Sequence, residues 1–491
     1  MSTITPTDRE RVVVDAVPKG LLIGGRWRES SSGATLSVED PATGQSLCEV
    51  ADGTPEDGLE ALAAAAAAQT SWAAHPPRER GEILRRAYEA LVRRVDDLAL
   101  LMTLEMGKAV EQSKGEILYA ADFLRWFSEE AVRIDGRYTV APSGTSRILT
   151  MRQPVGPCIL VTPWNFPMAM GTRKLGPAIA AGCTMVVKPA KQTPLSMLAL
   201  ARILEEAGLP EGVLNLVTTR SSGKVISPLL RDPRARKLSF TGSTEVGRLL
   251  MEQAAPNVMR VSMELGGNAP FLVFEDADLD AAVEGAMAAK MRNIGEACTA
   301  ANRFHVAESV AEEFTRRFAE RMSAQRVGRG TEPDTDVGPL IDEAGRGKVV
   351  SLVDDAVQRG ARTVVGGSPL PGPGYFYPPT VLAGVPHDAR ILREEVFGPV
   401  APIATFGTEE EGIAAANDTE FGLVAFAYTR DLHRALRVAE SLEAGMVGLN
   451  QGVVSNAAAP FGGVKQSGLG REGGHEGINE YVNVKYVAVA T

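Results

Sequence analysis

The segment from residue 158 to residue 240 decides the fold, because it contains four short apolar runs separated by helical stretches. The runs are Cys158-Ile159-Leu160-Val161, Met185-Val186-Val187, Val213-Leu214-Asn215-Leu216-Val217 and Leu238-Ser239-Phe240. One of the helical stretches extends from Leu195 to Ala207. Continuous apolar runs that alternate with helices are typical of βαβ units and of a parallel sheet buried on both faces. The sequence therefore predicts an α/β protein with the architecture of nucleotide-binding folds.

Two further regions complete this architecture. A second alternating set has apolar runs at Phe271-Leu272-Val273-Phe274, Phe304-His305-Val306, Thr363-Val364-Val365 and Val447-Gly448-Leu449, with a proline- and glycine-rich loop at 366–379. Between Thr54 and about Glu130, apolar residues recur at helical spacing. Because 491 residues exceed what one hydrophobic core supports, we expect two to four domains.

Two β-prone segments stand apart from these sets. Runs within residues 137–152 flank Pro142-Ser143-Gly144-Thr145, which is typical of a hairpin, and residues 481–489 form a β-rich tail. An isolated hairpin and an exposed terminal strand each need a pairing partner. We expect the hairpin to project and to pair with another element or subunit, and the tail of a neighbouring subunit is one candidate partner.

Composition excludes several classes of protein. A net charge of -10 without a basic stripe argues against nucleic-acid binding. The four cysteines are far apart and there are five histidines, which argues against a disulfide framework or a metal site and for a reducing compartment. The first 20 residues lack a signal peptide's apolar core, and the alanine run at 61–68 follows the soluble helix start Thr54-Pro55. We expect a cytoplasmic protein without a membrane segment.

One cysteine is placed as a nucleophile would be. Cys298 follows Gly295-Glu296-Ala297, between the end of a predicted helix and the strand at 304–306. A thiol attacks as its thiolate, and a free cysteine titrates near pH ~8.5, so its surroundings must supply a base or a positive field. The alternative is a small buried hydrophobic residue, which is the commoner role of an intracellular cysteine.

Four other segments carry candidate functional groups at predicted strand ends. Phe240-Thr241-Gly242-Ser243-Thr244-Glu245-Val246-Gly247 has the glycines of a turn that admits a pyrophosphate at a helix N-terminus, although a plain tight turn explains it as well. Lys188 and Lys191 follow the strand at 185–187, where ligands bind in parallel sheets, unless they are simply solvated. Asn165 can donate to an oxyanion, and Glu264 can activate a thiol or a water; a turn asparagine and a surface glutamate are the alternatives.

Seven motifs together resemble the aldehyde dehydrogenase superfamily, in that family's order. They are Pro163-Trp164-Asn165-Phe166-Pro167, Lys188-Pro189-Ala190, Phe240-Thr241-Gly242-Ser243-Thr244, Glu264-Leu265-Gly266-Gly267, Gly295 to Cys298, Glu395-Val396-Phe397-Gly398-Pro399 and Pro460-Phe461-Gly462-Gly463. The resemblance implies that Cys298 is the nucleophile, Glu264 the general base and Asn165 an oxyanion donor. It implies a dinucleotide site at Thr162, Pro163, Trp164, Lys188, Lys191, Gly242, Ser243, Glu395 and Phe397.

The resemblance also implies the domain organisation and the reaction. We expect a Rossmann-like cofactor domain (1–133 and 155–265), an α/β catalytic domain (266–468) and an oligomerisation element made of the hairpin and tail (134–154 and 469–491), in a homodimer or homotetramer. The thiolate adds to an aldehyde, hydride passes to the nicotinamide, and Glu264 activates the water that hydrolyses the thioester to a carboxylic acid.

Within the superfamily, the sequence is most similar to the succinate-semialdehyde dehydrogenases. The similarity rests on Met170-Gly171-Thr172-Arg173-Lys174, Arg292-Asn293, Val454-Ser455 and residues 462–473. In that subfamily, the positions of Arg173, Arg292 and Ser455 bind the substrate's far carboxylate, as guanidinium forks suit a small anion. The alternative for both arginines is a structural ion pair.

Three departures from the family pattern matter. Lys191 stands where NAD-preferring members often carry a glutamate; a lysine attracts a 2′-phosphate, so we expect NADP to be preferred, with NAD possible. Glu296 replaces a glutamine, and a carboxylate there raises the pKa of Cys298 if it is charged. Ala300 replaces a second cysteine, so an adjacent disulfide cannot form.

Other functions stay open at this point. The substrate could be glutarate semialdehyde, an amino-aldehyde or a general aliphatic aldehyde, although Arg173 and Arg292 favour an anion. Glu264 argues against a relative that transfers the acyl group to coenzyme A, since a hydrolytic base is expected only when water is the acceptor. The combination of Cys298, Glu264 and Asn165 argues against a non-catalytic protein on the same fold.

Overall fold

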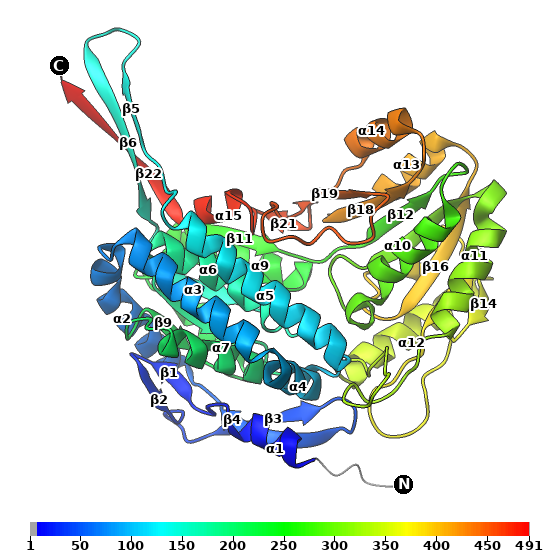
Figure 1. Ribbon diagram of the computed structural model, residues 1–491, viewed down its shortest axis with the longest axis horizontal. Coiled ribbons are helices and arrows are strands. Elements are labelled where there is room, and N and C mark those ends of the chain that lie inside the picture. Colours follow the sequence, from blue (N-terminus) through cyan, green and yellow to red (C-terminus); the bar gives the residue numbers. More distant parts are fainter. Residues whose placement is uncertain (1–6, 491) are drawn as a thin grey trace.

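The structure is a computed structural model that describes residues 7–490, and an eight-stranded sheet forms the centre of its first lobe (Figure 1). In spatial order its strands are β2 (Arg26–Arg28), β1 (Leu21–Ile23), β9 (Leu214–Leu216), β8 (Met185–Lys188), β7 (Cys158–Val161), β10 (Lys237–Thr241), β11 (Arg260–Glu264) and β21 (Gly468–Leu469). The five strands from β9 to β11 are parallel. The predicted alternation over 158–240 is confirmed, because each of its four apolar runs contributes one of these strands.

Helices cover this sheet and form much of its core. They are α1 (Asp8–Asp15), α2 (Pro55–Ala73), α3 (Pro77–Arg93), α4 (Val95–Met106), α5 (Val110–Glu130), α6 (Ala169–Ala181), α7 (Pro194–Glu206), α8 (Ser222–Arg231) and α9 (Thr244–Ala254). The helical reading of residues 54–130 is confirmed. Thr54 begins α2 as predicted, through a capping box with Asp57. The sequence pattern did not predict helix α1.

A seven-stranded sheet forms the second lobe (Figure 1). Its strands are β14 (Arg362–Val365), β15 (Thr380–Ala383), β16 (Val400–Phe406), β13 (Ala301–Ala307), β12 (Ala269–Val273), β18 (Val424–Tyr428) and β19 (Met446–Leu449). Around it lie α10 (Leu279–Met291), α11 (Glu308–Ser323), α12 (Glu343–Gln358), α13 (Glu409–Asn417) and α14 (Leu432–Ser441). Only β14 runs antiparallel to its neighbour among the pairings of this sheet.

The hairpin and the tail form one three-stranded sheet that projects from the body (Figure 1). Strand β6 (Ser146–Pro154) lies between β5 (Arg137–Val140) and β22 (Val482–Ala490), and all pairings are antiparallel. The expected pairing of the tail with the hairpin is confirmed, but the expectation that it joins neighbouring subunits is wrong. The register Val482↔Pro154 to Ala490↔Ser146 places β22 on the hairpin of its own chain. Helix α15 (Glu476–Asn479) leads into β22 and brings the tail to the hairpin's base.

Smaller elements complete the chain. Strands β3 (Thr35–Asp40) and β4 (Gln45–Ala51) form one two-stranded ribbon, and β17 (Phe421–Gly422) pairs with β20 (Val464–Lys465). Short 3-10 turns occur at Ala255–Asn257, Arg292–Gly295 and Arg390–Leu392. Within residues 7–490, every helix is too short or too polar to cross a membrane.

Candidate active site

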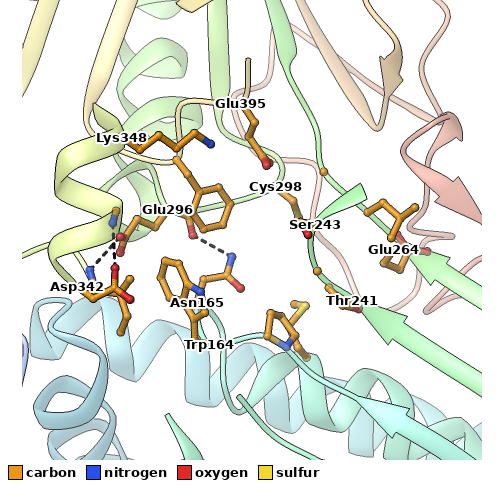
Figure 2. Close-up of a pocket in the computed structure, with 18 of the residues that line it drawn as sticks. Trp164, Asn165, Thr241, Ser243, Glu264, Glu296, Cys298, Asp342, Lys348 and Glu395 are labelled. Atoms are coloured by element: carbon orange, nitrogen blue, oxygen red, sulfur yellow. Dashed lines mark hydrogen bonds between the residues drawn. The ribbon is translucent and has the colours of Figure 1, made fainter. Parts of the chain in front are cut away.

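The carboxyl ends of the parallel strands of the first sheet open onto a cavity of about 380 Å³. Its far wall comes from the second lobe, so residues distant in sequence meet there (Figure 2). Among the lining residues are Pro163, Trp164, Asn165, Gly242, Ser243, Glu264, Cys298, Glu395 and Phe397. The structure thus brings the predicted catalytic residues together with most of the predicted cofactor residues, at the edge where ligands bind in α/β sheets.

Cys298 reaches the cavity from a loop between α10 and β13. Burial raises the pKa of its thiol to about 12. The cation of Arg173 opposes this rise, Glu395 and Glu264 add to it, and Arg292 again lowers it. The resting thiol is therefore neutral at physiological pH, and a nucleophilic role requires that a base take its proton.

Hydrogen bonds hold both the side-chain amide and the backbone carbonyl of Asn165. Its Nδ2 donates to the backbone carbonyl of Glu296 over 2.9 Å, as the dashed line in Figure 2 marks. Its own backbone carbonyl accepts from Nζ of Lys108 over 2.9 Å. An amide NH₂ carries two hydrogens, so one N–H of Asn165 is left for a ligand in the cavity.

Glu264 ends strand β11 and lines the same cavity. Both of its carboxylate oxygens are buried, and within the described part of the chain neither has a hydrogen-bond partner. Burial raises the pKa of this carboxyl well above its usual value, and the nearby Glu472 adds to the rise. An unpartnered carboxyl of raised pKa that lines the same cavity as a thiol has the properties of a general base.

Several groups around the cavity fit a dinucleotide. Ser243 is the N-cap of α9, so the positive end of that helix faces the cavity. The hydroxyls of Thr162 and Thr241 are buried without a partner among residues 7–490, which leaves them free to bind a ligand. Glu395 accepts the N–H of Gly267 over 3.1 Å, and burial raises its pKa to about 7. These observations fit the ribose and phosphate groups of NAD or NADP.

Aromatic packing shapes the same wall. The rings of Trp164 and Phe397 meet edge to face with centroids 5.3 Å apart. Phe397 has a φ of 54°, a left-handed conformation that turns its ring onto the cavity. The two rings, from different lobes, form an apolar surface suited to a planar ligand.

The two predicted lysines lie outside this cavity. Lys188 ends β8 and donates to Ser222 over 3.0 Å, and burial lowers its pKa to about 8. Lys191 is exposed and lines a neighbouring cavity of about 510 Å³. The two cavities share Ile341 and Asp342, so Lys191 borders a continuation of the main cavity.

Two of the three predicted substrate-binding residues contact each other, and the third makes an ion pair with a glutamate. Nη1 of Arg292 donates to Oγ of Ser455 over 3.0 Å, and its guanidinium lies over the rings of Tyr119 and Phe166. Arg173 instead is buried, with Nη2 2.9 Å from a carboxylate oxygen of Glu472. For Arg173, the structural ion pair considered as the alternative is present.

The sequence predicts that a charged carboxylate at Glu296 raises the pKa of Cys298, but in the structure this side chain is buried. Its carboxyl accepts the N–H of Ile341 over 3.1 Å, and burial raises its pKa well above the usual value. Because burial disfavours its ionised form, this carboxyl contributes less negative charge to a neighbouring thiol than an exposed carboxylate would. The carboxylates that raise the pKa of Cys298 are Glu395 and Glu264.

Sequence reasoning missed Asp342 and Lys348, which line the cavity from the start of α12. Asp342 caps α12 by accepting the N–H of Gly345, and the charge of Lys348 lowers the pKa of Glu395. An aspartate before Glu343 is an N-cap signal that predicts the helix start. Its place in the site depends on packing between the lobes, which the local sequence does not encode.

These features define the class of protein. The chain belongs to the aldehyde dehydrogenase family, whose model matches residues 27–487. It is therefore an aldehyde dehydrogenase, an enzyme that uses NAD or NADP.

Individual relatives and a solved structure are similar to this chain over most of its length. The chain is 62% identical over 444 residues to the succinate-semialdehyde dehydrogenase of Paenarthrobacter nicotinovorans, covering 90% of this chain and 99% of the relative. It is 49% identical to the glutarate-semialdehyde dehydrogenase of Pseudomonas aeruginosa, covering 95% and 96%. The crystal structure of an NADP-dependent enzyme from E. coli matches with a TM-score of 0.96 and 48% identity, covering 97% of this chain and 99% of that one.

Proposed function

We propose that this enzyme oxidises succinate semialdehyde to succinate, with NADP as the preferred cofactor. The observation that carries the substrate assignment is the contact between Arg292 and Ser455. The guanidinium of Arg292, six residues before Cys298, donates over 3.0 Å to the hydroxyl of Ser455 on a separate loop, and the two groups form a fork for a carboxylate. The relative from P. nicotinovorans bears the name of the same activity.

Cys298 is the nucleophile in this proposal. Its thiol loses a proton to Glu264, directly or through water, and the sulfur bonds to the aldehyde carbon. The oxygen of the resulting thiohemiacetal takes a hydrogen bond from the free N–H of Asn165, and such donors contribute about 3–4 kcal/mol in a dry site. When bound, the dinucleotide supplies a hydride acceptor, which leaves an acyl thioester on Cys298.

Glu264 completes the cycle. After the proton received from Cys298 has passed to solvent, the carboxylate takes a proton from a water molecule, whose oxygen attacks the thioester carbon. The carbon–sulfur bond breaks, the thiolate of Cys298 leaves, and the carboxylic acid is released. Burial and Glu472 raise the pKa of Glu264 above that of a surface glutamate, which makes its carboxylate a stronger base.

The dinucleotide would be held by both lobes. Ser243, Gly242 and the start of α9 would bind the pyrophosphate, while Glu395 and Phe397 would hold the nicotinamide end. Thr162, Pro163, Trp164 and Lys188 would complete the site around the ends of β7 and β8. Lys191 supports NADP over NAD, since an exposed cation in the adjoining cavity attracts a 2′-phosphate.

Glutarate semialdehyde is the second candidate substrate. It carries the same aldehyde and carboxylate with one more methylene, and the relative from P. aeruginosa is named for it. One methylene is worth about 1–3 kcal/mol of discrimination, so the two activities can coexist in one site. The homodimer or homotetramer and the cytoplasmic location stay predictions from the sequence.

The test measures reduced cofactor with succinate semialdehyde, glutarate semialdehyde and butanal, using NAD and NADP in parallel. We expect the highest kcat/KM with succinate semialdehyde and NADP. Arg292→Leu should raise KM for the two semialdehydes about 10- to 100-fold, the value of a hydrogen bond to a charged group, and leave butanal unchanged. Equal kcat/KM for butanal and succinate semialdehyde in the wild type would overturn the proposal.

A further inference from the structure

The loop that carries Cys298 begins with an unusual backbone. Asn293, Ile294 and Gly295 have φ values of 56°, 62° and 77°, so three consecutive residues are left-handed. Residues other than glycine rarely adopt this backbone conformation, and it persists only where surrounding contacts impose it. Gly295 has no alternative, because a Cβ there would lie 2.3 Å from the carbonyl oxygen of Gly398.

The contacts that impose this conformation converge on Asn293. Its side chain is buried, and Nδ2 donates to the backbone carbonyl of Asn165 over 3.0 Å and to that of Glu296 over 2.9 Å. Its backbone N–H donates to Oε1 of Gln112 on α5 over 2.8 Å. Asn293 therefore joins three segments that are far apart in sequence.

One of these acceptors is shared with the proposed oxyanion donor. The carbonyl of Glu296 accepts from Nδ2 of Asn293 and also from Nδ2 of Asn165. The position of this carbonyl decides which way the remaining N–H of Asn165 points. Glu296 lies two residues before Cys298, so the same carbonyl also fixes the approach of the nucleophile loop.

We propose that Asn293 is a positioning residue that holds the amide of Asn165 and the sulfur of Cys298 in register. It acts through the two carbonyls and does not touch the substrate. Gln112 supports it by holding its backbone. The inference rests on the proposed catalytic roles of Asn165 and Cys298, and it assigns to Asn293 a part in transition-state geometry rather than in substrate binding.

The test replaces Asn293 with glycine, which tolerates the left-handed backbone and removes the side chain with its amide. We expect kcat to fall about 100-fold, which is the loss in rate expected when a catalytic group is displaced. KM for the aldehyde should stay within about twofold of the wild type. In Asn293→Asp, kcat should fall further, because a carboxylate would face two carbonyl oxygens. The matched control is Asn215→Ala in β9, which removes a buried amide that also donates to two carbonyls; it should lower the thermal midpoint but not kcat.

A double-mutant cycle separates this role from a merely structural one. If Asn293 acts through Asn165, Asn293→Gly should cost much less in an Asn165→Ala background than in the wild type. Full additivity, or an unchanged kcat in folded Asn293→Gly, would overturn the inference. If that variant yields no folded enzyme, Gln112→Ala decides, and an unchanged kcat there overturns it. An Asn165→Ala variant of normal kcat would instead contradict the proposed role of Asn165.

Discussion

At the scale of single residues, the protonation of Cys298 governs reactivity. Since its pKa is raised to about 12 by burial, with Glu395 and Glu264 adding to the rise, the thiolate is scarce at neutral pH. We expect the rate of alkylation by iodoacetamide in the cofactor-free enzyme to rise roughly tenfold per pH unit between pH 7 and 9.5. Mass spectrometry of the Cys298 peptide measures the rate, and Cys298→Ala shows background labelling. A plateau below pH 9 would contradict this assignment.

A second residue-scale prediction concerns Glu264. With glutamine there, no base takes the proton of the Cys298 thiol or activates water, so both acylation and thioester hydrolysis should slow. In Glu264→Gln, the first turnover should be slower than in the wild type, and steady-state turnover should be at least about 100-fold slower. In the wild-type enzyme, steady-state turnover should rise with pH, because the raised pKa of Glu264 keeps the base protonated at low pH. Rapid-mixing absorbance measures both; normal turnover in the variant would show that another group is the base.

Among the structural elements, β22 supports a testable dependence. The hairpin formed by β5 and β6 projects from the body and pairs along the whole of β6 with β22 (Figure 1). A two-stranded hairpin alone is marginally stable in water. Removing residues 482–491 should therefore unfold it and make Arg147 and Arg152 susceptible to trypsin.

The control for this deletion is Val484→Ala, which changes an exposed side chain of β22 and leaves the pairing intact. Peptide mapping after limited proteolysis identifies the cleavage sites. Resistance of residues 137–154 in the truncated chain would show that the hairpin is stable without the tail.

The elements also show what the sequence could predict. Apolar runs predicted the four buried strands of residues 158–240, because strands buried on both faces have no polar side. The same rule missed β15, β16 and β18 of the second sheet, and it missed α1, whose charged residues hide its periodicity. The pairing of the tail with the hairpin was predicted correctly, but the strands belong to one chain, because the composition of an edge strand does not specify which copy of the chain supplies its partner. Strand ends placed Asn165 and Glu264 correctly in one cavity, whereas Asn293 carries no local signal of its contacts.

At the scale of the whole molecule, the cavity lies between the two lobes, so a ligand bound in it should stabilise their association. Gly242 and Ser243 approach it from the first lobe, and Lys348 and Phe397 from the second. A ligand that binds only the folded enzyme stabilises it by about 2.7 kcal/mol at 100 times its Kd. NADP should raise the thermal midpoint more than NAD at equal concentration, because the cation of Lys191 attracts the 2′-phosphate and lowers the Kd of NADP.

Lys191→Glu should reverse the order of the two cofactors, because a carboxylate repels the 2′-phosphate and accepts a hydrogen bond from a ribose hydroxyl. Scanning calorimetry of both proteins with each cofactor measures the shifts, and an order unchanged by the substitution would show that Lys191 does not select the cofactor.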